Sequence, residues 1–158
     1  MGRIYTLDEL IATREEWRRA AKRVAFTNGC FDILHPGHVR LLEQARALGD
    51  VLIVGLNSDA SVRRMKGPER PFFDEQSRAY LVSRLSAVDA VIIFHEDTPR
   101  DVIAALLPDV LVKGADWAHH IVGREEVEAA GGEVHTIPLE PGFSTTSIAE
   151  RLASSRRT

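Results

Sequence analysis

Thirteen consecutive residues carry the most structural information in this chain, and they read Phe26-Thr27-Asn28-Gly29-Cys30-Phe31-Asp32-Ile33-Leu34-His35-Pro36-Gly37-His38. Residues 24–26, which lead into the glycine turn, are continuously apolar, as is typical of a parallel strand buried on both faces. Residues 37–48 repeat apolar side chains at helical spacing and predict an amphipathic helix. Gly29 lies between the two elements and allows the backbone to approach a ligand closely. The stretch therefore predicts a strand, a tight turn and the start of a helix.

Two histidines lie on either side of the expected helix start. His35 and His38 are three residues apart, so both rings can face one spot. Free backbone N–H groups at a helix N-terminus attract anions, and two imidazoles beside them add hydrogen-bond donors. A histidine pair that only caps the helix or satisfies the core is the alternative, but the preceding Asn28-Gly29 pair favours phosphate binding. We therefore expect a site for a phosphate chain and for the charge that develops on it in a transition state.

Apolar runs and helical patterns alternate along the rest of the chain. Strands are expected at residues 24–27, 51–56, 90–94, 110–112 and 133–137, and helices at 37–48, 74–86, 99–107, 124–130 and 145–153. This alternation predicts an α/β fold with a doubly wound, parallel, five-stranded sheet. Ligands bind such sheets beyond the carboxyl ends of the strands, where the strand order reverses. The histidine segment follows the first expected strand, which is the appropriate place.

The chain length of 158 residues favours a single domain, residues 1–158. Its expected parts are an N-terminal helix, an α/β core and a frayed polar tail, at residues 1–22, 23–153 and 154–158. Thr6 and Glu9 form a capping-box pattern, which predicts that the first helix begins at about residue 7. Residues 63–73 are rich in glycine, proline and charge, and they predict a mobile surface loop.

Composition and charge argue against several classes of protein. Hydrophobic residues make up 44% and charged residues 27% of the chain, as in ordinary globular proteins. The net charge of −3 argues against nucleic acid as the main partner, because neutralising its phosphates needs an excess of positive charge. No apolar run approaches the ~20 residues of a membrane helix, and residues 1–13 lack the apolar core of a secretory signal. The single Cys30 excludes an internal disulfide and fits the reducing cytoplasm, where we expect the protein.

The histidine segment resembles the nucleotidyltransferases with a His-x-Gly-His signature, which join a nucleoside triphosphate to a small phosphate or carboxylate and release pyrophosphate. From residue 26 to about residue 151 the chain is similar to one branch, the adenylyltransferases that make ADP-heptose from D-glycero-β-D-manno-heptose 1-phosphate. The segments that carry the resemblance are residues 26–35, Gly37-His38, Leu48-Gly49-Asp50, Asn57-Ser58-Asp59-Ala60-Ser61, Lys66-Gly67, Arg70-Pro71, Glu96-Asp97-Thr98-Pro99, Leu111-Val112-Lys113-Gly114, Gly131-Gly132-Glu133-Val134 and Ser144-Thr145-Thr146. The resemblance implies a Rossmann-like nucleotidyltransferase fold, ATP and a sugar 1-phosphate as substrates, Mg²⁺ as cofactor, and a homodimer.

The resemblance also implies roles for the residues around the phosphates. His35 and His38 are expected to stabilise the charge that builds on the α-phosphate, and Lys66 to close over the reacting phosphates. The β- and γ-phosphates are expected at Ser144-Thr145-Thr146, where three hydroxyls open the last helix. An ordinary N-cap is the alternative there, and both interpretations are compatible. The remaining nucleotide contacts are expected from Thr27, Asn28, Gly29, Phe31 and Gly114.

Four further residues are expected to support the site or to contact the substrate. Asp32 is interpreted as a residue that orients a histidine or fixes the loop. Asp59 is interpreted either as a helix cap or as a residue near the substrate. Arg70 is a second cation of the expected loop. Arg78 is interpreted either as half of a surface ion pair or, by the resemblance, as a contact to the triphosphate or an anchor of the loop.

The last candidate site residues lie in the segment that follows the fourth expected strand, residues 113–117. Gly114 allows a base or sugar to lie against the backbone, and Asp116 is expected to accept hydrogen bonds from hydroxyl groups. A tight turn with a packing Trp117 is the alternative. The adjacent His119 and His120 lack further spaced ligands, so we expect no metal site built from protein side chains there.

Two rival functions stay open at this level. The first is a cytidylyltransferase that acts on glycerol 3-phosphate or a similar alcohol phosphate, although such enzymes carry an arginine shortly before their Ser-Thr-Thr, which residues 138–142 lack. The second is a nucleotide-binding regulatory module without turnover, against which the two histidines, the loop lysine and the hydroxyl cluster argue. Many heptose enzymes are fused behind a sugar kinase, for which 158 residues leave no room, so a separate kinase is expected to supply the sugar phosphate.

Overall fold

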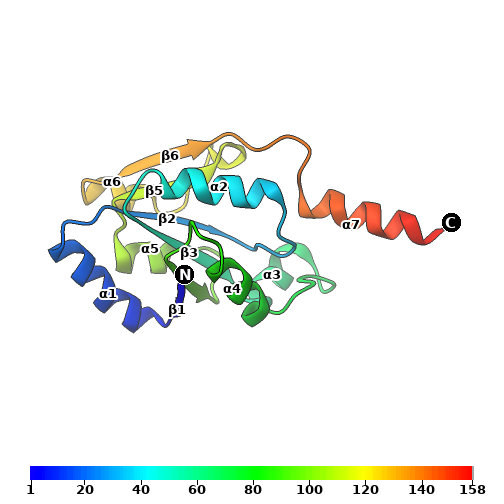
Figure 1. Cartoon of the computed structure of the whole chain (residues 1–158), viewed down its shortest axis with the longest axis horizontal. Helices are drawn as coiled ribbons and strands as arrows, with labels where there is room; N and C mark the ends of the chain where they lie inside the picture. Colours follow the sequence, from blue (N-terminus) through cyan, green and yellow to red (C-terminus); the bar gives the residue numbers. More distant parts are fainter. Residues whose placement is uncertain (158) are drawn as a thin grey trace.

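Six parallel strands form the centre of the structure, in the order β1-β4-β3-β2-β5-β6 (Figure 1). The computed structural model describes residues 1–157. The strands are β1 Arg3–Tyr5, β2 Val24–Gly29, β3 Val51–Asn57, β4 Ala90–Phe94, β5 Val110–Gly114 and β6 Glu133–Ile137. The chain runs from β2 to β3 and β4 on one side, while β5 and β6 lie on the other, so the strand order reverses between β2 and β5. The doubly wound parallel sheet expected from the sequence is confirmed.

The sheet has one strand more than the five expected. The additional strand, β1, is three residues long and mostly exposed, and it pairs with β4 at the edge of the sheet. A strand this short offers neither a continuous apolar run nor a clear alternation, so its sequence carries no recognisable strand signal. The other strands begin where the sequence predicts, and β2, β3 and β5 continue one or two residues further than expected.

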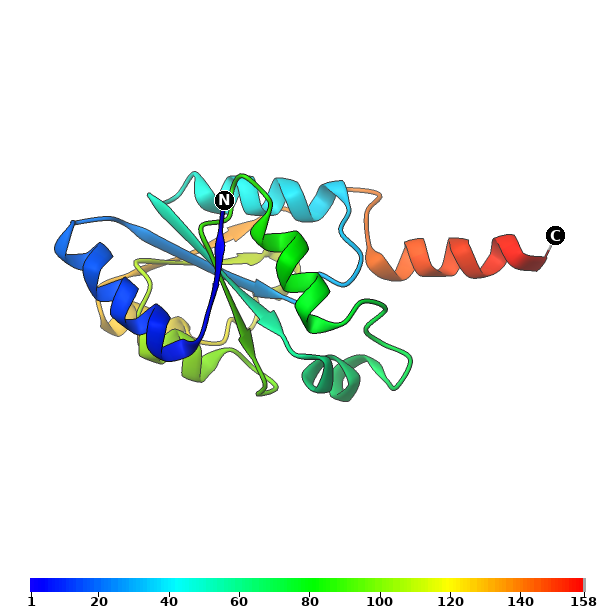
Figure 2. The ribbon, with the colours of Figure 1, turned by 60° about the horizontal axis from the view of Figure 1, so that its bottom comes forward.

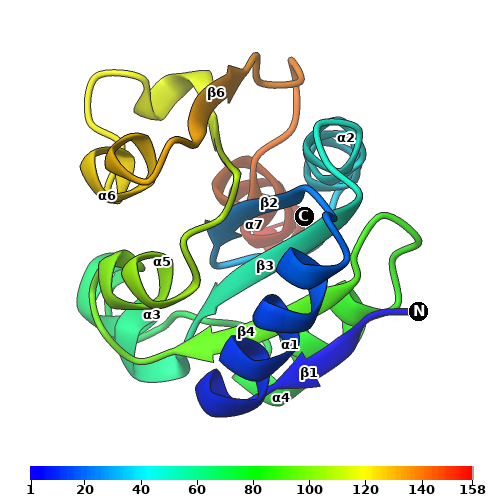
Figure 3. The ribbon, with the colours of Figure 1, turned by 90° about the vertical axis from the view of Figure 1, so that its left-hand side faces the viewer.

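Helices cover both faces of the sheet (Figure 3). Within residues 1–157 they are α1 Leu7–Arg19, α2 Pro36–Arg46, α3 Asp59–Lys66, α4 Glu75–Ser83, α5 Arg100–Leu106, α6 Arg124–Ala129 and α7 Thr145–Ser154, with 3₁₀ helices η1 Ala115–Trp117 and η2 Ser155–Arg157. α2 and α4 contribute to the core on one face, and α1, α5 and α6 to the core on the other. β3 is buried along its whole length because both of its faces are covered. No helix in this part of the chain is long and apolar enough to cross a membrane.

Two helices near the predicted site differ from expectation. α3 continues through Lys66, so the first four residues of the expected loop 63–73 are helical rather than loop. The three cations in its last turn suit the negative end of a helix, which stabilises a helix that the Gly-Pro-rich surroundings obscured. α7 extends away from the sheet (Figures 1 and 2). The expected frayed tail is helical through residue 157, and Thr158 lies outside the described residues.

Candidate active site

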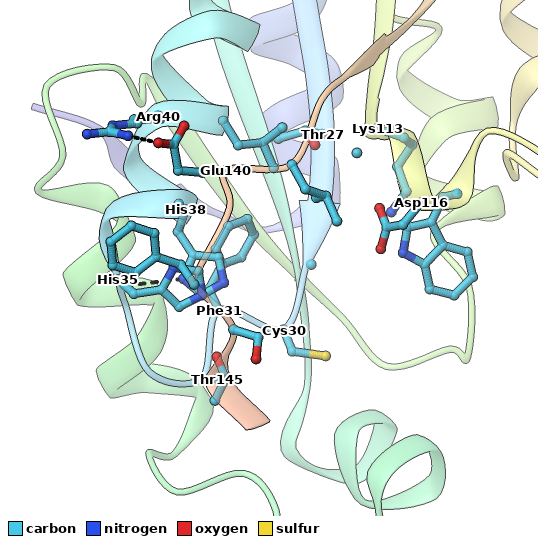
Figure 4. Close-up of a pocket in the computed structure, with 18 of the residues that line it drawn as sticks. Thr27, Cys30, Phe31, His35, His38, Arg40, Lys113, Asp116, Glu140 and Thr145 are labelled. Atoms are coloured by element: carbon cyan, nitrogen blue, oxygen red, sulfur yellow. Dashed lines mark hydrogen bonds and ion pairs between the residues drawn. The ribbon is translucent and has the colours of Figure 1, made fainter. Parts of the chain in front are cut away.

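A pocket of about 340 Å³ opens at the carboxyl ends of β2 and β5, where the strand order reverses (Figure 4). The turn after β2, the start of α2, the end of α3, the end of β5 and the start of α7 meet around it. The expected site residues that line it are Thr27, Asn28, Gly29, Phe31, His35, His38, Lys66, Gly114, Asp116, Trp117, Ser144, Thr145 and Thr146. The expected residues that do not line it are Asp32, Asp59, Arg70 and Arg78.

The two histidines stack on each other at the wall of the pocket. Their ring centroids are 3.7 Å apart and the ring planes differ by 20°. His35 is the N-cap residue of α2, and its backbone N–H donates to Nδ1 of His38 at 3.4 Å. Since Nδ1 of His38 accepts this hydrogen bond, the proton of the neutral ring is on Nε2. The first turn of α2 thereby orients His38 as a hydrogen-bond donor, and the three-residue spacing brings the rings together as expected.

Both imidazoles are neutral at pH 7 in the protein without ligand. Burial, followed by the nearby His35 and Lys66, lowers the pKa of His38 to about 4. Burial also lowers the pKa of His35. A phosphate chain in the pocket would oppose both effects, because an adjacent anion favours the protonated ring. The neutral rings can therefore donate hydrogen bonds to a ligand. They would become protonated only if a bound anion raised their pKa.

The start of α7 lies beside the two histidines and lines the same pocket. Ser144 is its N-cap residue, and its Oγ accepts a hydrogen bond from the backbone N–H of Ser147. Thr145 is buried, and its hydroxyl donates to the carbonyl of Ile33 at 3.4 Å, which joins α7 to the turn before α2. The first backbone N–H groups of a helix lack partners within the helix and carry partial positive charge. Capping by Ser144 and binding of an anion are therefore compatible at this terminus.

Two buried polar atoms at the pocket have no hydrogen-bond partner within residues 1–157. They are Oγ1 of Thr27 and Nδ1 of His35. Thr27 is 1% exposed and ends up beside the pocket because it stands near the carboxyl end of β2 (Figure 4). An unsatisfied buried polar atom is costly, and nearly all such atoms in folded proteins find a partner. Both residues line the pocket.

Gly29 has a packing role that the sequence alone does not reveal. A Cβ atom at this position would lie 3.0 Å from the ring of Phe31. Phe31 itself adopts a positive φ of 46°, an uncommon conformation for a residue with a side chain. The absence of a side chain at Gly29 thus lets the buried Phe31 ring fold back under the turn, 5.2 Å from the ring of His38.

Lys113 is a pocket residue that sequence analysis did not select. Its Nζ donates to Oδ1 of Asn28 at 3.2 Å, across the point where the strand order reverses, and lies 5.5 Å from the ring centre of Trp117. Burial lowers the pKa of Lys113, and the negative charge of Asp116 opposes that shift. Gly114 leaves room for this carboxylate, since a Cβ there would lie 2.7 Å from Oδ1 of Asp116. Two signals were available: Lys113 stands at a strand end directly before Gly114, and it belongs to one of the segments that carry the family resemblance.

Asp32 fixes the loop that follows α3. It is 2% exposed and accepts hydrogen bonds from Nε of Arg70 at 2.8 Å and from the backbone N–H groups of Phe72 and Phe73. Among the described contacts it has none with a histidine. Of the two interpretations, the geometry therefore favours loop fixation, with Arg70 as the partner that brings the loop to the signature turn.

Arg78 is buried and is not half of a surface ion pair. It donates to the carbonyl oxygens of Cys30, Asn57 and Phe73 and pairs with Asp59 at 2.8 Å. Arg78 therefore joins three segments: the turn that follows β2, the end of β3 and the loop after α3. This is the arrangement expected of a residue that anchors the loop. Asp59 is the first residue of α3 rather than its cap, since Ser58 is the N-cap residue.

Cys30 lines the pocket beside the histidines (Figure 4). Burial raises the pKa of its thiol. A protonated thiol is a weak nucleophile, so the burial of Cys30 argues against a nucleophilic role and favours that of a small residue packed in the turn.

Comparison with known proteins identifies relatives over nearly the whole chain. Residues 26–151 match the family described as cytidylyltransferase-like. The bifunctional protein HldE of Hyphomonas neptunium is 60% identical over 146 residues, which cover 92% of this chain and 30% of that protein. The HldE protein of Acidiphilium cryptum is 54% identical and is matched over 98% of this chain and 32% of its own length. The chain thus spans about a third of these curated relatives.

Solved structures with the same fold are also known. A lipopolysaccharide core biosynthesis protein from Thermoplasma volcanium superposes with a TM-score of 0.61 at 32% identity, covering 75% of this chain and 97% of that protein. Pantothenate synthetase from Thermus thermophilus superposes with a TM-score of 0.58 at 19% identity, covering 85% of this chain and 61% of that one. The second likeness concerns the fold alone.

Proposed function

The chain belongs to the cytidylyltransferase-like family, and we propose that it transfers AMP from ATP to D-glycero-β-D-manno-heptose 1-phosphate, giving ADP-heptose and pyrophosphate. The observation that carries this proposal is the stacked pair of neutral histidines beside the N-terminus of α7 in one pocket. Such an arrangement suits a polyphosphate, because both the histidines and the helix terminus attract its negative charge. The similarity to HldE proteins and to a lipopolysaccharide core biosynthesis protein supports a heptose phosphate as the acceptor and lipopolysaccharide as the destination of the product.

The reaction is an in-line displacement at the α-phosphorus of ATP. An oxygen of the sugar phosphate attacks that phosphorus, the bond to the α,β-bridging oxygen breaks, and pyrophosphate leaves with the electron pair. The attacking phosphate is already an anion, so no general base is required. His35 and His38 donate to the non-bridging oxygens as charge builds on them. The terminus of α7 holds the leaving phosphates, and Lys66 neutralises negative charge on the phosphate chain.

Mg²⁺ is proposed to enter the pocket bound to ATP. Within residues 1–157 no three His, Cys, Asp or Glu side chains converge closely enough to form a cation site. We therefore propose that the oxygen ligands of Mg²⁺ come from the triphosphate and from water, as they commonly do. The protein groups proposed to act on the phosphates are therefore the histidines, Lys66 and the start of α7.

We also propose a homodimer that resides in the cytoplasm. α7 extends from the body, Leu152 on it is 60% exposed, and a helix of ten residues is marginally stable without packing. A second copy that covers α7 would bury this side chain. Sedimentation analysis is expected to give a dimer for the natural chain and a monomer for Leu152→Glu, and a monomeric natural chain would contradict the proposal.

The function is tested by pyrophosphate release with Mg²⁺ for each pairing of ATP or CTP with the heptose 1-phosphate or glycerol 3-phosphate. Release with ATP and the heptose phosphate alone is the expected result. Release with CTP and glycerol phosphate would preserve the mechanism and overturn the specificity. ATP binding without release from any pair would favour a regulatory module.

A further inference from the structure

A third aromatic ring extends the histidine stack. The ring of Phe143 lies nearly parallel to that of His35, with centroids 5.9 Å apart and planes that differ by 15°. This separation is within the range of offset-stacked aromatic pairs. The three rings therefore form one row, in which His35 lies between His38 and Phe143.

The backbone is shaped to bring Phe143 to this place. Gly142 before it has a positive φ of 85°, which turns the chain toward the pocket, and Ser144 after it is the N-cap residue of α7. Gly37 in the first turn of α2 leaves space, since a Cβ there would lie 3.0 Å from the His35 ring and 3.3 Å from Cβ of Phe143. A phenylalanine that is 40% exposed contributes little to the core, so its contact with His35 is the more informative feature.

The His35 ring contacts the rings of His38 and Phe143. Its Nδ1 is buried and has no partner within residues 1–157, and its backbone N–H contacts His38 rather than its own ring. We propose that Phe143 is a positioning residue, which fixes the His35 ring and, through it, the orientation of the histidine pair toward the reacting phosphates. Since Phe143 directly precedes the start of α7, it also ties the histidines to the terminus that holds the leaving phosphates.

The proposal predicts a change in the titration of His35. Burial lowers its pKa, and removing the Phe143 ring admits water to that face, so the pKa should rise toward its ordinary value. The other titratable or charged groups that line the pocket are His38, Cys30, Lys66, Lys113, Asp116 and Arg40, and Arg40 is paired with Glu140. None of these is removed by the substitution. A residue with a purely structural role elsewhere would leave this titration unchanged.

The test combines kinetics with an NMR titration of the His35 ring, assigned by its loss in His35→Gln. Phe143→Ala is expected to lower kcat by ~10-fold to ~100-fold with a smaller change in KM, as misplaced catalytic groups do, and to raise the His35 pKa. Phe143→Tyr should retain the kcat and the His35 pKa of the natural chain. Phe143→Leu keeps the bulk of the side chain without an aromatic ring, so its kcat and His35 pKa should lie between those of the natural chain and of Phe143→Ala. Tyr80→Ala removes another exposed aromatic ring, one that does not line the pocket, and should change neither readout.

Unchanged kcat in folded Phe143→Ala would overturn the proposal, as would a fall in kcat with an unchanged His35 titration. If Phe143→Ala does not fold, kcat and the His35 pKa are compared between Phe143→Leu and Phe143→Tyr instead. Equal values in these two variants would overturn the proposal. The kinetic half rests on the proposed function, whereas the titration does not. Absence of turnover in the natural chain would therefore reject the proposed function, while the titration would still decide whether Phe143 controls His35.

Discussion

Replacing Arg78 by methionine removes a fully buried cation that several parts of the fold share. The guanidinium donates to the carbonyls of Cys30 and Asn57 at 2.8 Å and to that of Phe73 at 2.9 Å. Its remaining nitrogen pairs with Asp59 at 2.8 Å. Methionine fills a similar volume and offers no donor, so all four acceptors lose their partner at once.

The size of the effect follows from the burial of the two partners. Removing one member of a buried ion pair costs about 3 to 5 kcal/mol, because the other charge stays behind without compensation. The side chain of Asp59 is 25% exposed, so water compensates in part, while the carbonyl oxygens add a desolvation cost of their own. We therefore expect a loss of about 3 to 5 kcal/mol in the free energy of unfolding. For a chain of this length, that loss corresponds to a fall in Tm of about 6 to 20 °C.

Urea and thermal unfolding, followed by circular dichroism, measure this loss. Arg124→Met is the matched control, because Arg124 pairs with Glu128 on an exposed helix face and such pairs contribute less than about 1 kcal/mol. Arg78→Lys keeps the charge but not the planar fork, so it should restore only part of the stability. If Arg78→Met lost no more stability than Arg124→Met, the account of Arg78 as the anchor of the signature turn would be wrong.

Three further outcomes are expected. His38→Ala should lower kcat by at least ~100-fold with little change in unfolding, as loss of a transition-state donor does, and full activity in steady-state assays would remove His38 from the mechanism. The His38 ring binds a proton near pH 6.5 in the unfolded chain but only near pH 4 when folded, so its contribution to the free energy of unfolding rises as pH increases between these values. Urea unfolding at pH 4.5 and 7 should therefore show a smaller pH dependence in His38→Gln than in the natural chain, and equal dependence would contradict the buried neutral ring. Asp32→Asn should loosen the loop after α3 and speed proteolytic cleavage there, whereas Asp97→Asn, which weakens an exposed pair with Arg64, should not.

The sequence was sufficient for the features that depend on local pattern. Continuous apolar residues predicted β3, and the Thr6–Glu9 spacing predicted the capping box of α1. The spacing of His35 and His38 around a helix start predicted that their rings would share one spot, and they stack. These features follow from neighbours along the chain, which the sequence displays directly.

Features that depend on contacts between distant segments could not be predicted in the same way. Lys113 lies at the site because β5 pairs with β2. The sequence of neither strand reveals which strand it pairs with. Arg78 has the sequence surroundings of a surface helix residue, yet its acceptors come from three other segments. Phe143 gains significance only where the turn at Gly142 brings it against His35.

The most direct test of the central claim follows an isotope through the reaction. The natural chain is incubated with MgATP and heptose 1-phosphate whose phosphate oxygens carry ¹⁸O, and both products are analysed by mass spectrometry. Attack by the sugar phosphate on the α-phosphorus predicts ADP-heptose that retains all of the label, together with unlabelled pyrophosphate. Labelled pyrophosphate, or the absence of ADP-heptose, would contradict the account.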